Sequence, residues 1–445
     1  MLLGAAQAAA PSPDLLAVHA TVTTLDNGLT VVLEEQHRTD MVALHLRYGV
    51  GSRDQAAGQG GCAHLFEHLM FEGSAHVPNK KFDDWLTAAG ADNNAFTTEN
   101  ETAYHMTYPS GAMDLALFLE SDRMGFLLAG LTPTSLKNQQ DVVLRERAQD
   151  YAAAHGRDWD ALTTLMYPAG HPYHSPVIGT EGDIRAFTLD STTGFWKEHY
   201  RPRNAVLALV GNFKTDDAIA AIKKWWSDVP DNGPAVPRGG VPVLAPRRAD
   251  GFLEDQVDDW TVYLAWPGVP RFSPDEPALD LLAKVLSGGR GTRLDDALYY
   301  KSGLTTSIYA DFEPGDLGGP FALAATSPKS QLTKIAGVME KIVGGVQSHP
   351  PTADELGRAL ESEKSRFLDE VEEPEGRANA LADCQAYFGH PDCLQEWWSK
   401  YEAVKPEDLV RVAKTYLGDD RRISLSVVPT GKGGQLPGSN KVELP

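Results

Sequence analysis

The sequence is poor in cysteine, in positive charge and in long apolar runs. Three cysteines among 445 residues allow at most one disulfide bond within the chain. No stretch reaches the roughly 18 consecutive apolar residues of a membrane-spanning helix, so we expect no membrane span. Lys and Arg number 40 against 61 Asp and Glu, which gives a net charge of −21 at pH 7. This shortage of basic residues argues against a nucleic-acid partner, because phosphate binding needs basic patches.

The N-terminal residues also lack something, namely the positively charged start of a secretory signal. Residues 1–10 are small and apolar and run into Pro11-Ser12-Pro13, which resembles the end of such a signal, with a cleavage site at residues 8–10. We therefore predict that residues 1–14 are a signal remnant or a flexible tail. An exported, periplasmic location is the prediction, and the cytoplasm is the alternative.

The three cysteines fit that compartment. Cys384 and Cys393 flank a Gly-His-Pro turn and could close a short disulfide loop in an oxidising environment. Cys62 is expected to be a small buried residue.

A chain of this length suggests two or three domains. Residues 229–251 are rich in proline and glycine and predict a semi-rigid linker. This linker separates residues 15–228 from residues 252–445.

The two halves show the same order of predicted elements. Residues 41–48 and 204–210 have the pattern of strands in the first half, as do residues 261–266 and 423–428 in the second. The starts of the two strands lie 163 residues apart in one half and 162 in the other. We therefore predict an α+β fold of two similar halves. Each is expected to be a mainly antiparallel sheet with helices packed on one face.

The strongest chemical signal is His64-Leu65-Phe66-Glu67-His68, which has the form H-x-x-E-H. On a helix, residues i and i+4 lie on the same face, so His64 and His68 could bind one cation while Glu67 reaches a water beside it. Imidazole nitrogens suit zinc, and a catalytic zinc site has three protein ligands. This motif is associated with metallopeptidases. The alternative to a metal site is an ordinary pair of core or surface histidines.

A third ligand is needed, and Glu146 is a candidate. Thr132 and Pro133 are typical of a helix start, and the helix continues through apolar residues to Glu146. An unpaired carboxylate among such neighbours is costly, and a metal removes the cost. A salt bridge to Arg145 or Arg147 explains Glu146 equally well. The matching helix of the second half, residues 279–284, has no histidine, so metal chemistry is expected in the first half alone.

The first half resembles the pitrilysin/insulinase family of inverted zinc peptidases, the inverzincins, and in particular its short, processing-peptidase-like bacterial members. The resemblance covers most of residues 25–213. It rests on residues 25–31, 49–53, 60–74, 94–97, 101–104, 141–146, 171–173, 178–180, 200–205 and 210–211.

The resemblance implies a role for each matching residue. His64, His68 and Glu146 would bind one zinc ion per chain, and Glu67 would be the general base. Asn94 and Ala95 would bind an extended peptide substrate, although their sequence also fits a plain surface loop. The implied function is that of a zinc metallo-endopeptidase that hydrolyses unfolded peptides or small proteins inside a dimeric chamber.

The chain departs from the family at two places. Gln139 stands where the family usually has a second glutamate, so we expect weaker zinc binding. In the second half, Tyr299 and Thr306 stand where active relatives have an arginine and a tyrosine that hold the substrate. We therefore predict a heterodimer in which a homologous chain supplies both residues, with a homodimer as the lesser alternative.

Two other functions stay open. One is a non-catalytic scaffold or core subunit, and the other is a peptide-binding protein with a structural zinc. The remaining histidines, among them His105, His171, His174 and His199, are expected to be packing or surface residues.

Overall fold

A computed structural model of the chain describes residues 15–231, 233 and 247–444. The predicted tail, residues 1–14, lies outside the described residues, as does most of the predicted linker at 229–251. Strand β7 (Ala249–Asp255) begins within the last residues of that linker. None of the described helices is long and apolar enough to cross a membrane.

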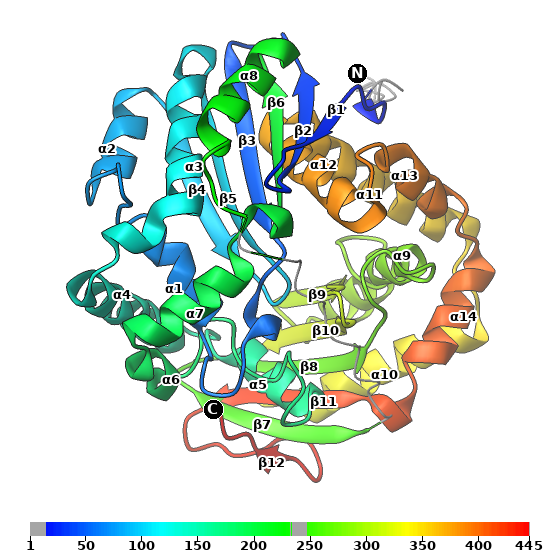
Figure 1. The fold of residues 1–445 in the computed structure, drawn as a ribbon. Coiled ribbons are helices and arrows are strands. Elements are labelled where there is room, and N and C mark those ends of the chain that lie inside the picture. Colours follow the sequence, from blue (N-terminus) through cyan, green and yellow to red (C-terminus); the bar gives the residue numbers. More distant parts are fainter. Residues whose placement is uncertain (1–14, 232, 234–246, 445) are drawn as a thin grey trace, which may run out of the picture.

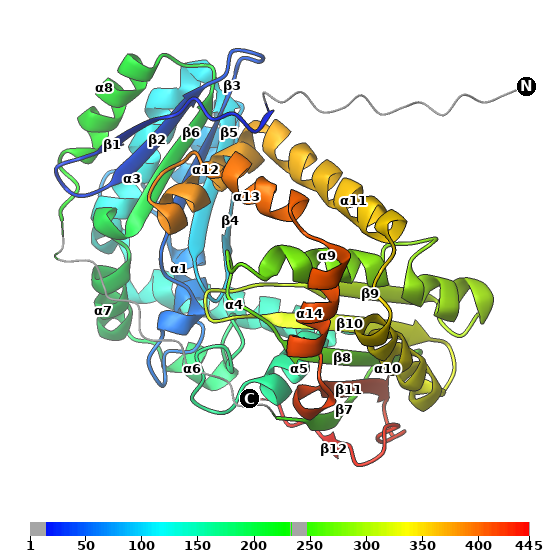
Figure 2. The same ribbon diagram turned by 90° about the vertical axis from the view of Figure 1, so that its right-hand side faces the viewer.

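Two six-stranded sheets with matching strand order form the framework (Figures 1 and 2). The first has the order β1-β2-β6-β3-β5-β4 and the second β12-β7-β11-β8-β10-β9. β2 and β6 are parallel, as are β7 with β11 and β12, and the other neighbours are antiparallel. The strands are β1 (Thr21–Thr24), β2 (Thr30–Glu35), β3 (Met41–Tyr48), β4 (Asp92–Thr97), β5 (Thr102–Pro109), β6 (Ala205–Gly211), β7, β8 (Trp260–Pro267), β9 (Ser307–Phe312), β10 (Pro320–Ser327), β11 (Ile423–Pro429) and β12 (Asn440–Lys441).

Helices surround both sheets. Those of the first half are α1 (Cys62–Leu69), α2 (Lys81–Ala88), α3 (Met113–Gly130), α4 (Pro133–Ala152), α5 (Asp158–Met166), α6 (Glu181–Ala186), α7 (Leu189–His199) and α8 (Thr215–Trp226). Those of the second half are α9 (Glu276–Leu286), α10 (Leu332–Ser348), α11 (Ala353–Glu372), α12 (Pro374–Phe388), α13 (Leu394–Glu402) and α14 (Pro406–Tyr416), with a π-helical segment at Asp295–Lys301. The predicted class, two similar α+β halves with mainly antiparallel sheets, is confirmed.

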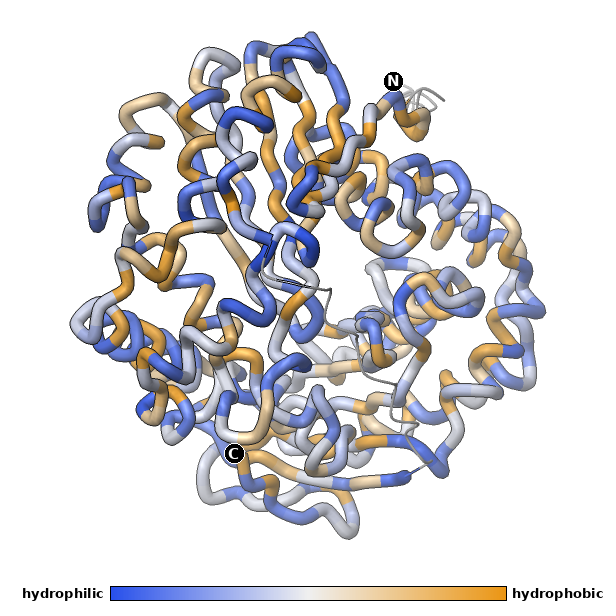
Figure 3. Tube along the Cα trace, in the orientation of Figure 1, coloured by the Kyte–Doolittle hydropathy of each residue, from blue (hydrophilic) through white to orange (hydrophobic). Residues whose placement is uncertain are grey.

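Helices pack on one face of each sheet, as predicted, and the halves also exchange helices that cover the opposite face. α12 of the second half packs on the first sheet, where Ala378, Leu381 and Ala382 meet strands β2, β3 and β6. α5 of the first half packs in the same way on β7, β8 and β11. β6 is consequently covered on both sides, which explains why it is buried and hydrophobic along its whole length (Figure 3).

Residues 25–31, one of the segments on which the family resemblance rests, form mostly a turn and not a strand. Leu25 N donates to Leu29 O at 2.9 Å, and Gly28 has φ +89°. β2 begins only at Thr30, because the turn residues Asp26, Asn27 and Gly28 reverse the chain after β1.

Candidate metal centre and substrate edge

Helix α1, which carries the H-x-x-E-H motif, begins at a close approach between two loops. Gly61, just before the helix, has φ +86°, and a Cβ there would lie 2.5 Å from the carbonyl oxygen of Ile178. Glycine is therefore required at this position. Cys62, Leu65, Phe66 and Leu69 are buried against the first sheet, which fixes the rotation of the helix.

Two tyrosine hydroxyls donate hydrogen bonds to backbone carbonyls of α1. Tyr104 of β5 donates to the carbonyl of Phe66 at 3.2 Å, and Tyr200 donates to the carbonyl of Ala63 at 3.3 Å. Both phenol groups are buried. The helix is thus held at the residues that flank His64 and Glu67.

Helix α4 brings Glu146 to the same place. Thr132 caps this helix, with Pro133 in its first turn, as predicted. Arg147 Nε donates to the carbonyl of Gly179 at 3.0 Å, which ties α4 to the loop beside the start of α1. In this arrangement Glu146 Oε1 lies 3.7 Å from His64 Nε2, and Oε2 lies 3.1 Å from His68 Nε2.

His64, His68 and Glu146 therefore form one group, with a ligand atom of each within 4.8 Å of the others. Two imidazoles and a carboxylate are a donor set of catalytic zinc sites, and these residues fit such an ion. Burial lowers the pKa of His64 to about 4, so its imidazole is neutral and free to bind a metal at pH 7. The hydrogen bond with His68 holds the pKa of Glu146 below its ordinary value, although partial burial opposes this shift.

Glu67 lies on the same helix, turned toward strand β4 at the edge of the first sheet. Its Oε2 accepts a hydrogen bond of 2.7 Å from the hydroxyl of Thr97, the last residue of β4. Burial raises the pKa of Glu67, while the Thr97 hydroxyl opposes that rise. Sequence reasoning did not single out Thr97. Period-two alternation from Ala95, which packs against the core beside α1, is the signal that could have found it.

Asn94 and Ala95 lie in β4, the edge strand of the first sheet, and not in a surface loop. Among the described strands, β4 pairs with β5 alone, so its other edge is available to a further strand. The backbone N–H of Ala95 donates to the side-chain oxygen of Asn94 at 2.9 Å. The side-chain oxygen of Asn94 thus accepts the hydrogen bond of a main-chain N–H in an edge strand.

Gln139, which stands at the position of the family's second glutamate, donates to the side chain of Glu72. Glu72 follows α1, and its backbone carbonyl and side chain also accept hydrogen bonds from the Asn79 amide. Gln139 therefore links α4 to the end of α1 through a neutral amide.

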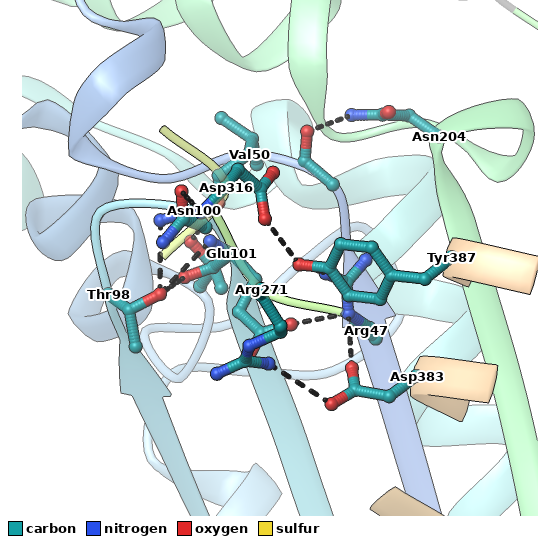
Figure 4. Close-up of polar contacts among 12 residues, drawn as sticks. Arg47, Val50, Thr98, Asn100, Glu101, Asn204, Arg271, Asp316, Asp383 and Tyr387 are labelled. Atoms are coloured by element: carbon teal, nitrogen blue, oxygen red, sulfur yellow. Dashed lines mark hydrogen bonds and ion pairs between the residues drawn. The ribbon is translucent and has the colours of Figure 1, made fainter. Parts of the chain in front are cut away.

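A polar network joins strand β3 and the turn after β4 to the second half of the chain (Figure 4). Arg47 of β3 contacts Glu101, which follows β4, and its Nε lies 3.0 Å from Asp383 of α12. Arg271 lies 3.3 Å from the other oxygen of Asp383, and Tyr387 donates to Asp316 at 2.6 Å. Sequence reasoning missed this network, since partners such as Arg47 and Asp383, which are 336 residues apart, leave no local pattern.

The second half contributes a cavity and a disulfide. A cavity of about 690 Å³ lies between the halves, lined from both, and Phe96 and Glu99 belong to its wall. The three metal-binding candidates are not among the described residues that line it. Cys384 and Cys393 form a disulfide at its edge with a Cα–Cα distance of 5.5 Å, as the sequence suggested, and Cys62 is buried and free.

With this geometry established, comparison with known proteins is informative. Residues 30–180 match the sequence pattern of the insulinase family, peptidase family M16, and residues 186–363 match the pattern described as the peptidase M16 inactive domain. The chain belongs to the M16 peptidase family. The H-x-x-E-H helix α1, helix α4 and the edge strand β4 all lie in the part that matches the insulinase pattern.

Relatives span nearly the whole chain. An uncharacterized zinc protease of Streptomyces coelicolor is 26% identical over 419 residues, which are 91% of this chain and 88% of that protein. The zinc protease PqqE of Helicobacter pylori is 26% identical over 434 residues, 92% and 93% of the two chains. The crystal structure of a protease from Helicobacter pylori has the same fold, with a TM-score of 0.83 at 24% identity over 92% of this chain and 99% of that one.

Proposed function

We propose that the chain is the zinc-bearing subunit of a metallo-endopeptidase that cleaves unfolded peptides. The grouping of His64, His68 and Glu146 around one point, with Glu67 on the same helix, carries this proposal. The names of the M16 relatives, which include zinc proteases, support zinc as the ion. A bound zinc ion would supply Lewis acidity, polarising the scissile carbonyl and making a water molecule more acidic.

Glu67 is the general base in this proposal. Its carboxylate accepts the proton of the attacking water and then passes it to the leaving amine. Thr97 Oγ1 holds one carboxylate oxygen, Oε2, and so leaves the other oxygen to face the water. Glu67 thus acts from a fixed orientation.

The open edge of β4 receives the substrate. An extended peptide adds to a sheet edge through main-chain hydrogen bonds, and an unfolded segment has main-chain groups free for this purpose. The Asn94 side chain, which holds the Ala95 N–H, would release that donor to the peptide. Because Thr97 is on the same strand, the peptide lies beside the residue that positions Glu67.

The decisive experiment replaces Glu67 with Gln. This substitution keeps the size of the side chain and the metal-binding residues, so we expect unchanged zinc content by atomic absorption. Hydrolysis of unfolded peptides should fall by about 10²–10⁴-fold because the base is lost. Unchanged turnover would contradict the mechanism. A wild-type chain that binds zinc and peptide but cleaves no peptide, either alone or with a homologous chain, would favour a peptide-binding protein instead.

We further propose that a homologous chain without H-x-x-E-H completes the active site. Tyr299 and Thr306 replace the arginine and tyrosine of active relatives, and Tyr299 is half-exposed at the surface of the second half. Co-purification with such a chain, and activity only in the mixture, are expected. Full activity of this chain alone would refute the heterodimer.

The disulfide supports export to an oxidising compartment such as the periplasm. Protein isolated from periplasmic extract in the presence of an alkylating agent should show modification at Cys62 alone after unfolding. Modification of all three cysteines would contradict an oxidising location.

A further inference from the structure

We propose that the face of β4 opposite the metal centre carries a pocket that binds a lysine or arginine side chain of the peptide. The inference rests on the proposed function, since it takes the peptide to lie along the β4 edge. It adds a specificity site that the metal-centre geometry does not include.

The two faces of β4 have different surroundings. Ala95 and Thr97 face α1, where Thr97 contacts Glu67. Asn94 and Phe96 point to the opposite face, where the ring of Phe96 lies 6.3 Å from that of His45 and 6.1 Å from that of His105. Successive side chains of a strand alternate between faces. A peptide beside β4 would therefore present every second side chain to the His45 face.

The register of the sheet defines a row that this peptide would extend. His45 of β3 pairs with His105 of β5, and His105 pairs with Asn94 of β4. The next member of the row would be the peptide residue opposite Asn94. Its side chain would stand beside these three, because directly opposed residues share a face.

A cavity of about 490 Å³ lies on this face. Phe96 and His105 line it from the sheet, and the junction between α11 and α12 lines it from the other side with four carboxylates, those of Asp369, Glu370, Glu373 and Glu375. Lys and Arg are absent from the described residues of its wall. Some charge is already compensated, since His105 Nδ1 lies 2.7 Å from Glu375 and Arg366 lies 3.3 Å from Glu370. The excess of carboxylates favours a cationic ligand.

His45 gives an independent indication of a ligand. Its side chain lines the cavity and is 2% exposed, yet Nε2 has no hydrogen-bond partner among the described residues. Buried polar atoms normally have a partner, so a missing one requires an explanation. Burial lowers the pKa of His45 to about 3, which keeps the ring neutral and able to accept a hydrogen bond from an ammonium or guanidinium group. The nearby Arg47 is already paired with Glu101 and Asp383.

The test measures peptide binding to the zinc-loaded Glu67→Gln chain, which separates recognition from hydrolysis. Fluorescein-labelled peptides of equal length carry lysine, norleucine or glutamate at alternate positions, with alanine between them. A fourth peptide has the same lysines placed side by side, which keeps the charge but not the alternation. Affinities come from fluorescence anisotropy, and cleavage of the norleucine peptide by the wild-type chain mixed with its homologous partner chain tests the proposed function separately.

We expect the alternating lysine peptide to bind about five- to tenfold more tightly than the norleucine peptide, as two partly exposed ion pairs allow. The glutamate peptide should bind most weakly, and the clustered lysine peptide should bind less tightly than the alternating one. The double variant Asp369→Asn, Glu375→Gln should lose most of the lysine preference. The control Glu372→Gln removes a charge from α11 at a residue outside the cavity wall and should retain the preference.

Equal loss of preference in the control and the double variant would overturn the pocket, because general attraction to an acidic protein would then explain the binding. Absence of any peptide binding would also overturn it. Cleavage without lysine preference would refute this inference alone, whereas lysine preference in a wild-type chain that cleaves nothing even when mixed with the partner chain would refute the proposed function alone.

Discussion

The two halves of the chain share a framework and differ in chemistry. Helices α4 and α11 each have 20 residues and each begin with a capping threonine, Thr132 or Thr352. Glu146 and Arg366 both lie 14 residues after their caps. In the first half this position contributes a carboxylate to a possible metal site, whereas in the second it carries a cation that contacts Glu363 and Glu370.

The second half therefore retains the scaffold, and its described residues contain no group of metal-binding donors like that of the first half. α9 has no histidine, and its buried Glu276 and half-buried Asp280 lie at the cavity between the halves. Burial, followed by the charge of Asp280, raises the pKa of Glu276 to about 8. The shared fold thus places side chains at equivalent positions in both halves, and the residue type at each position decides the chemistry.

We expect the largest difference between the two halves when the third ligand candidate, Glu146, is replaced. Glu146→Gln should lower zinc affinity by more than the roughly 10- to 100-fold that loss of an outer hydrogen-bond partner costs. Hydrolysis should fall with the zinc content. Arg366→Gln, at the matching position of α11, should leave zinc binding unchanged. Competition with a fluorescent chelator measures both affinities, and equal zinc affinity in the two variants would contradict the assignment.

At a fixed pH, the contact between the halves gives the next largest effect. Asp383→Ala leaves the guanidinium groups of Arg47 and Arg271 without this carboxylate, and we expect a loss of about 3 kcal/mol in the free energy of unfolding. Glu372→Ala removes a carboxylate that faces Arg38 at the surface and should cost at most about 1 kcal/mol. Urea unfolding compares the variants. Equal losses would mean that the network does not hold the halves together.

The disulfide occurs in the second half only. Replacing Cys384 and Cys393 with serine should lower the free energy of unfolding by about 2–3 kcal/mol, because the unfolded chain loses a closed loop of ten residues. A reducing agent should destabilise the wild-type protein by a similar amount and leave the double variant unchanged. The account of this bond fails if the reducing agent has no effect on wild type.

The buried acids of the second half predict a pH dependence. A carboxyl group whose pKa is higher in the folded state binds its proton more tightly there, so its contribution to stability declines as pH rises. For Glu276 this decline runs from the ordinary value of 4.5 to about 8, and is on the order of 5 kcal/mol. Glu276→Gln should flatten urea-derived stability across this range. An unchanged slope would show that Glu276 titrates normally.

The smallest expected effect concerns Thr97. Thr97→Val removes the hydrogen bond to Glu67 while keeping a similar shape, and kcat should fall about tenfold with little change in KM or zinc content. Thr97→Ser retains the hydroxyl and should restore most of kcat. If serine and valine give the same rate, Thr97 has no role in positioning the base.

Much of this arrangement was predictable because its signals are local. The period of α1 placed His64 and His68 on one face, and the cap at Thr132 located the helix of Glu146. The repeated order of elements predicted two similar halves. Such signals involve residues within one helix or strand, where spacing defines position.

The rest depends on contacts between distant segments. The exchange of α5 and α12 between the sheets leaves a uniformly hydrophobic β6, a pattern that does not say which helix covers it. Nor does the sequence pair Arg47 with Asp383, since an arginine and an aspartate 336 residues apart have many other possible partners. The Thr97 contact needed the relative placement of β4 and α1.

The central claim is that one zinc ion binds between α1 and α4, and anomalous X-ray scattering at the zinc edge tests it most directly. For crystals of the purified chain we predict a single peak about 2.0–2.2 Å from His64, His68 and Glu146, with none beside Arg366. A peak elsewhere, or none after zinc addition, would contradict the account.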